Sequence, residues 1–145
     1  MPQIPGIIIL RQRQLLLRVL KLWVVVNDRN IYHLIEGEPL LIQTHQLPTK
    51  IIAQNGYHSS EPFYINEGSD KPLYIKVGCN VDNEQFWGSL ILSAVFFTLF
   101  FLTSLDFILV LANVPLLFLI YQFFFKHKEF ITITTVKVVY DKQTK

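Results

Sequence analysis

One stretch of forty residues limits what this chain can fold into. Residues 86–125 contain a single charged side chain, Asp106. A soluble domain within a chain of 145 residues has no use for so long an apolar run, whereas a membrane protein requires one. Forty helical residues would extend about 60 Å, twice the roughly 30 Å thickness of the hydrocarbon core. We therefore predict that the segment crosses a membrane twice, as a helical hairpin.

The same lengths indicate where the hairpin turns. A break at residues 113–115 would leave a second piece of about 16 Å, which is too short to cross. A break at residues 103–106 leaves segments 87–103 and 106–125, about 25 and 30 Å long, and both can cross. This break also brings the Asp106 carboxylate to water, whereas at mid-bilayer it would cost at least about 2.5–3.5 kcal/mol. We predict transmembrane helices over 87–103 and 106–125.

Two residues are expected to form the membrane turn. Ser104 is positioned to cap the second helix, because a serine hydroxyl accepts hydrogen bonds from the first free N–H groups of a helix. Asp106 then lies in the first helical turn, where the helix dipole favours a negative charge. Two helices enclose no pore, so we interpret Asp106 as a turn residue rather than as part of an ion path.

Four residues are expected to pack the two helices together. Gly88 and Ser93 are small and would allow the helix backbones to approach closely. Asn113 is polar within an apolar helix and should need a hydrogen-bond partner on the other helix. Pro115 should kink the second helix. Ala112 would suit the same close contact.

Basic residues indicate the orientation in the membrane. Lys126 and Lys128 follow the hairpin directly, whereas the turn at 103–106 carries no basic residue. Short flanks rich in Lys and Arg stay in the cytoplasm. The first ten residues lack the basic start and the apolar core of a signal peptide. We expect an integral protein of the cytoplasmic (inner) membrane with both termini in the cytoplasm.

Residues 1–85 have the pattern of an all-β domain. Runs of β-branched and aromatic residues alternate with turn signals at 27–30, 36–39 and 67–70. A spacing of roughly 8–12 residues between turns is typical of a β-sandwich or barrel. We predict a β-sandwich of about seven short antiparallel strands, at residues 7–10, 22–26, 31–35, 40–45, 50–55, 63–66 and 73–77.

Two further segments belong with this domain. Residues 11–21 have basic residues at helical spacing, which would fit a short helix on a membrane surface or a strand with a basic edge; we favour the strand. Residues 126–145 form a basic flank followed by a β-rich run at 130–140. Because the hairpin returns the chain to its starting side, we expect this C-terminal strand to join the domain's own sheet.

The turns NDRN, EGEP and EGSD between short strands resemble those of a known kind of module. Residues 22–78 resemble the PEGA-type and carboxypeptidase-regulatory-like β-sandwich modules. The whole chain also looks like short bacterial membrane proteins that join such a module to one or two hydrophobic helices. The resemblance implies a sandwich with a structural or binding role and carries no activity.

The reactive side chains form no recognisable catalytic or metal-binding pattern. His33, His45 and Cys79 could bind a metal only if separate strands brought them together, and their spacing matches no zinc motif. The segment 58–61, His-Ser-Ser-Glu, contains the residue types of a nucleophilic centre but is expected to be a polar turn. Cys79 is interpreted as a small core residue. We predict no cofactor, no metal and no enzymatic activity.

Two functions remain open after these exclusions. A net charge of +2 is too small for a nucleic-acid-binding surface, and no small-molecule substrate is indicated. The first hypothesis is a membrane-anchored binding or adaptor module that presents a cytoplasmic β-sandwich to a protein partner. The alternative is an accessory subunit whose helices pack into a larger membrane complex or form a homo-oligomer. In both cases the lipid bilayer is the first partner.

Overall fold

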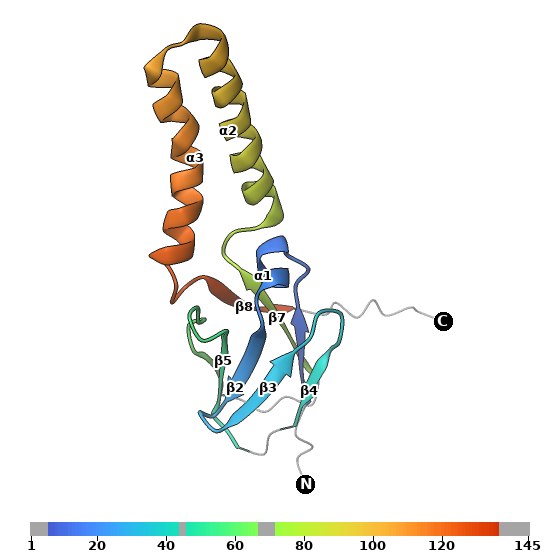
Figure 1. Cartoon of the computed structure of the whole chain (residues 1–145). Helices are drawn as coiled ribbons and strands as arrows, with labels where there is room; N and C mark the ends of the chain where they lie inside the picture. Colours follow the sequence, from blue (N-terminus) through green and yellow to red (C-terminus); the bar gives the residue numbers. More distant parts are fainter. Residues whose placement is uncertain (1–5, 44–45, 67–71, 137–145) are drawn as a thin grey trace, which may run out of the picture.

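Two four-stranded sheets and three helices make up the described part of the chain. The computed structural model describes residues 6–43, 46–66 and 72–136. Two of the helices are long and apolar, and they project side by side from one end of the sheets (Figure 1). The third helix is short and lies between the sheets and the long helices (Figure 1).

The first sheet contains one parallel strand pair. Its strands are β4 (Leu40–Ile42), β1 (Ile7–Arg11), β7 (Leu73–Cys79) and β8 (Ile131–Val136), in that order. β1 and β7 run parallel, with Ile7 opposite Leu73 and Arg11 opposite Val77. The expectation of antiparallel strands throughout is therefore wrong at this pair. The two strands are joined through the whole second sheet rather than by a hairpin, so no tight turn fixes their relative direction.

The second sheet is antiparallel throughout. Its strands are β3 (Asn30–Leu34), β2 (Leu22–Val26), β5 (Thr49–Gln54) and β6 (Phe63–Ile65), in that order. The turn between β2 and β3 has positive φ angles at Asn27 and Asp28, 51° and 56°. Tight hairpin turns require such angles, and Asn and Asp tolerate them better than most residues. The turn predicted at 27–30 is confirmed.

Both sheets contribute to one hydrophobic core. The fully buried side chains include Ile9 and Ile75 from the first sheet and Val24 and Ile51 from the second. Phe130, which follows the long helices in sequence, is 1% exposed and belongs to the same core. The expectation that the C-terminal strand joins the domain's own sheet is confirmed for residues 131–136, which pair with β7. Residues 137–145 lie outside the described part.

The segment 11–21 is not a strand. β1 ends at Arg11, and a short helix, α1, spans Leu15–Val19. The Arg11 guanidinium donates to the carbonyls of Leu17 and Leu20, so the end of this short helix is held by a side chain from β1. Leu17 is fully buried in the core. The prediction of a strand is therefore wrong, and the helical alternative is confirmed for Leu15–Val19. The buried Leu17 and the hydrogen bonds from Arg11 stabilise this helix.

The two long helices are α2 (Asn83–Thr103) and α3 (Asp106–Phe124). Their lengths, about 31 and 28 Å, and their composition would allow each to span a membrane. The break lies where it was predicted, between residues 103 and 106. α2 begins four residues before the predicted start at 87, because the Asp82 carboxylate accepts a 2.8 Å hydrogen bond from Gln85 N and caps the helix.

Removing the helices should leave a domain that still folds. Asn80 N donates to the Phe130 carbonyl at 2.8 Å, so the chain enters and leaves the hairpin at neighbouring points. We expect a variant with residues 82–128 replaced by a short Gly/Ser linker to be soluble without detergent and to keep its β-sheet circular dichroism. A fragment of residues 1–85 lacks β8 and Phe130 and should aggregate. A 1–85 fragment as soluble and as β-rich as the linker variant would contradict this account of the core.

Candidate functional site

The residues predicted for the membrane turn lie at the end of the hairpin far from the sheets (Figure 1). Ser104 has a left-handed conformation, with φ 54°, and its N–H donates to the Phe100 carbonyl at 2.7 Å. Ser104 therefore ends α2. The N-cap of α3 is Leu105, which makes no side-chain capping bond, so the expectation that Ser104 caps α3 is wrong. Asp106 is exposed and is the first residue of α3.

Two of the predicted packing residues do not lie in the contact between the helices. Gly88 is exposed, and outside its own helix no described atom lies within 4 Å of where a β-carbon would stand. Asn113 is exposed and donates from Nδ2 to the Leu109 carbonyl of its own helix at 2.8 Å. The expectation of a partner across the helix pair is wrong, because the side-chain amide donates to the preceding turn of its own helix.

Small residues do lie in the contact at two other positions. Ser93 of α2 is 3% exposed and Ala112 of α3 is fully buried. Within the described residues the Ser93 hydroxyl has no hydrogen-bond partner. Pro115 lies inside α3 and is half-buried. Each long helix thus buries one small side chain, which permits close approach of the two backbones.

The structure does not assemble the metal site considered from sequence. His33 is exposed on β3 of the second sheet, Cys79 is buried on β7 of the first, and His45 lies outside the described residues. Among the described residues no three His, Cys, Asp or Glu side chains gather as metal ligands would. The Cys79 thiol donates to the Val81 carbonyl at 2.7 Å, and burial raises its pKa to about 11. Cys79 is therefore a protonated core residue near neutral pH.

The segment 58–61 is more than a polar turn. His58 and Ser60 are both buried, with His58 only 2% exposed. The Ser60 hydroxyl accepts from Ala53 N and donates to the Glu61 carbonyl, each at 3.0 Å, so it fixes the start of the next segment. The segment is thus polar, as expected, but His58 and Ser60 are buried and hydrogen-bonded rather than exposed to solvent.

His58 and its neighbour connect the sheets to α3. His58 Nε2 lies 3.0 Å from the Phe123 carbonyl, and the Tyr57 hydroxyl donates to the Phe124 carbonyl at 3.4 Å. The last carbonyls of a helix have no partner within the helix, so they need donors from elsewhere. We call this contact, between loop 55–60 and residues 123–127, the helix–sheet joint. The joint supplies the end of α3 with two donors, one from His58 and one from Tyr57.

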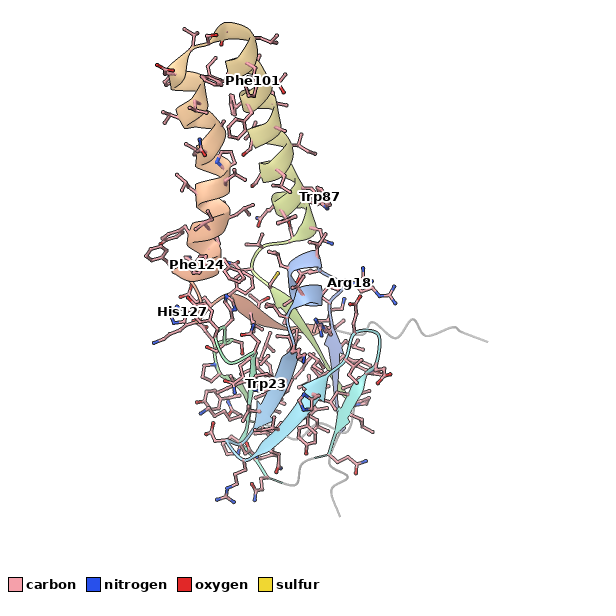
Figure 2. All side chains as sticks on the ribbon, viewed as in Figure 1. Arg18, Trp23, Trp87, Phe101, Phe124 and His127 are labelled. Carbon is pink, nitrogen blue, oxygen red and sulfur yellow. The ribbon has the colours of Figure 1, made fainter. Side chains whose placement is uncertain are left out.

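The joint continues beyond the end of α3. Ser59 N donates to the His127 carbonyl at 3.0 Å, and the Tyr57 and His127 rings lie 5.6 Å apart. In Figure 2, Phe124 and His127 mark the end of α3 that meets the sheets. Loop and helix end are therefore joined by backbone, side-chain and ring contacts together.

Asn55 determines the proton position on the His58 ring. The Asn55 Oδ1 atom accepts from Tyr57 N at 3.1 Å and from His58 N at 2.6 Å. Its amide nitrogen consequently faces His58 Nδ1, at 3.4 Å. An NH₂ group can only donate, so Nδ1 accepts and the ring proton sits on Nε2, where it is donated to the Phe123 carbonyl.

The surroundings of His58 favour its neutral form. The ring packs against the rings of Phe123 and Phe130, at centroid distances of 4.5 and 4.4 Å, and these two rings also contact each other. Burial lowers the pKa of His58, the hydrogen bond to the Phe123 carbonyl partly opposes this, and the nearby His127 lowers the pKa further. His58 is therefore an uncharged hydrogen-bond donor near neutral pH.

A second contact holds the start of α2. Leu15 N donates to Asn83 Oδ1 at 2.7 Å, and Asn83 Nδ2 donates to the Arg13 carbonyl at 3.4 Å. Beside these bonds Leu16 and Phe86 line a small apolar hollow of about 220 Å³ that reaches the end of α3. Both long helices are thus attached to the sheet region where they meet it.

No protein-family model, curated protein or solved structure matches this chain. The buried polar groups His58, Ser60 and Cys79 are all engaged in hydrogen bonds to backbone. Of these three residues, His58 binds the end of α3 and so joins the helical hairpin to the sheets.

Replacing His58 should weaken the joint. His58→Ala removes a buried donor and a ring packed against two phenylalanines, and we expect the free energy of unfolding to fall by about 2–4 kcal/mol. Chemical denaturation in detergent would measure this loss, and hydrogen exchange at residues 123–127 should increase. His33→Ala is the matched control, because His33 is exposed, and its effect should stay within about 0.5 kcal/mol. Equal effects of the two substitutions would contradict the assigned role.

The joint should weaken in acid. The pKa of His58 is lower in the folded protein than its ordinary value near 6.5, so the unfolded chain binds the proton more readily. The stabilisation is complete above about pH 6.5 and is lost as pH falls below that value. Denaturation midpoints of the native chain and of His58→Phe, measured from pH 8 to pH 5, should show a steeper decline for the native chain. Parallel curves would exclude His58 as the titrating group.

Proposed function

We propose that the chain is an integral protein of the bacterial cytoplasmic (inner) membrane. In this proposal α2 and α3 cross the bilayer and hold a non-catalytic β-sandwich, a binding or adaptor module, against its cytoplasmic face. The observation that carries the proposal is the exposure of the helices. In the most apolar eighteen residues of each helix, 6% are buried. Surfaces this apolar are stable in lipid and would drive aggregation in water.

The exposed aromatic residues support a position of the sheets close to the membrane surface. Trp87 lies exposed near the start of α2, and Tyr121 and Phe124 lie exposed near the end of α3. Trp and Tyr favour the interface between headgroups and acyl chains. Trp87 and Phe124 lie at the end of the hairpin that meets the sheets (Figure 2). This arrangement supports a sheet region directly beneath the headgroups.

The charged flanks support a cytoplasmic position for the sheets. Lys126 and Lys128 lie just beyond α3, on the side of the sheets. The opposite turn, at residues 103–106, has the acidic Asp106 and no basic side chain. Segments rich in Lys and Arg are retained in the cytoplasm during insertion. The turn therefore belongs on the periplasmic side.

The buried polar groups favour a binding role over catalysis, because their hydrogen bonds are made to backbone atoms. His58, Ser60 and Cys79, the residues considered as reactive groups, hold backbone segments in place. The resemblance of residues 22–78 to PEGA-type and carboxypeptidase-regulatory-like modules points to the same role. The rigid joint would keep such a module at a fixed height and orientation below the membrane.

Cysteine labelling in intact cells tests the topology. The native Cys79 is buried with a pKa of about 11 and should not react with maleimides in the folded protein. A membrane-impermeant maleimide should label Ser104→Cys from outside. Arg29→Cys and Lys128→Cys, on the side of the sheets, should react only after permeabilisation. The reverse pattern would overturn the orientation, and recovery of the chain in the aqueous fraction without detergent would overturn the membrane assignment.

A further inference from the structure

Two edge strands of the described sheets lack the usual protection, and β8 is the longer of them. β4 and β6 each have three residues and follow Pro39 and Pro62, whereas β3 has five residues and contains no Lys, Arg, Asp, Glu, proline or glycine. β8 is the longest of these edges, with the sequence ITITTV, and it contains no charge, proline or glycine. Edge strands are normally shortened, charged or interrupted by proline, because a bare edge pairs readily with another strand. β8 is thus suited to accept a further strand.

Hydrogen bonds around β7 show which backbone groups of β8 point toward the open edge, where a further strand would bind. Antiparallel strands alternate between pairs that exchange hydrogen bonds and pairs that do not. Asn80 N donates to Phe130 O at 2.8 Å, so the register places Thr132 and Thr134 in bonded pairs. The backbone groups of Ile131, Ile133 and Thr135 consequently point away from β7, toward the open edge.

Bonds on the far side of β7 agree with this assignment. Gln12 N donates to the Val77 carbonyl at 2.8 Å, and Cys79 N donates to the Gln14 side chain at 2.6 Å. Val77 and Cys79 therefore direct their backbone groups away from β8. They are the residues opposite Ile133 and Ile131 in the register.

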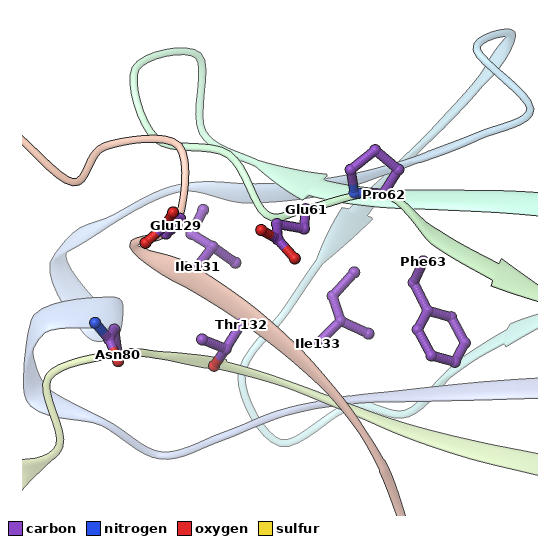
Figure 3. Close-up of a pocket in the computed structure, with 8 residues that line it drawn as sticks. All are labelled: Glu61, Pro62, Phe63, Asn80, Glu129, Ile131, Thr132 and Ile133. Carbon is purple, nitrogen blue, oxygen red and sulfur yellow. The ribbon is translucent and has the colours of Figure 1, made fainter.

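A hollow runs along the same edge. It has a volume of about 350 Å³ and is lined by Ile131, Thr132 and Ile133 of β8, with Glu61 and Phe63 across from them (Figure 3). Successive side chains of a strand point to opposite faces of the sheet. A hollow on one face of the sheet would border only alternate residues. This hollow borders three consecutive residues of β8, so it lies along the edge of the strand and leaves space for a further strand there.

We propose that this edge pairs with the β8 edge of a second copy of the chain. The two strands would run antiparallel about a two-fold axis directed along α2 and α3, and the two first sheets would form one continuous sheet. The inference rests on the proposed membrane insertion, because two chains in one bilayer with the same orientation share an axis along the membrane normal.

The geometry and charge of β8 fit this occupant. In Figure 1, β8 runs across the direction of α2 and α3, as a strand must if a two-fold axis along the helices is to place its copy antiparallel beside it. The six residues of β8 are uncharged, so the two strands themselves meet without like-charge repulsion. Confinement of both copies to one bilayer raises their effective concentration.

A proline substitution tests the pairing. Thr135→Pro removes an N–H that faces the open edge and leaves the ladder to β7 intact. The full chain in mild detergent should have the mass of a dimer by light scattering, and Thr135→Pro should have the mass of a monomer. Thr135→Val keeps the N–H at the same position and should remain dimeric. A monomeric native chain, or a proline variant as dimeric as the valine variant, would overturn the proposal.

Cross-linking in membranes tests the same pairing without detergent. A two-fold axis brings the central residue of β8 opposite its own copy, within reach of a disulfide. With single cysteines at positions 132, 133 and 134, an oxidant should yield covalent dimers at one position at least. Ile31→Cys, 63% exposed on the edge of the other sheet, is the control and should yield none. Absence of dimers at all three positions, with Ser104→Cys still labelled from outside, would refute the pairing and leave the membrane proposal standing.

Discussion

The pairing of β8 with β7 holds the two ends of the chain in one core. The six residues of β8 lie opposite residues 74–79, and Phe130 and Ile131 fill the core beside Val77. The sheet that begins before the long helices is therefore completed only by residues that follow them. The entry and exit of the hairpin must lie side by side for this to happen, which explains why two antiparallel helices, rather than one, separate β7 from β8.

The joint shows how a loop from another part of the fold can complete the hydrogen bonding at a helix end. Phe123 and Phe124 have carbonyls that α3 itself cannot satisfy. A loop from the sheets supplies the donors through His58 and Tyr57. Because the histidine is held neutral by its burial, it serves as a donor without introducing a charge beside apolar helices. Attachment and capping are thus accomplished by the same residues.

Features determined by neighbouring residues were predictable from sequence, and features determined by distant ones were not. The turn at 27–30, the break between 103 and 106 and the C-terminal strand follow from local composition. The contact of His58 with Phe123 joins residues 65 positions apart, and nothing in its loop distinguishes a buried histidine from an exposed one. Gly88 and Asn113 were misplaced because α2 and α3 are apolar on every side, so no pattern indicates which face meets the other helix.

The late position of β8 in the chain has a consequence for biogenesis. A ribosome delivers β1 to β7 first, and these strands must wait with the edge of β7 unpaired while the apolar segments are synthesised. Exposed strand edges in such intermediates invite misassembly. Completion of the sheet then reports that both helices have left the exit tunnel and turned back toward their starting side. A chain whose hairpin does not bring residues 131–136 back to β7 would keep an incomplete sheet.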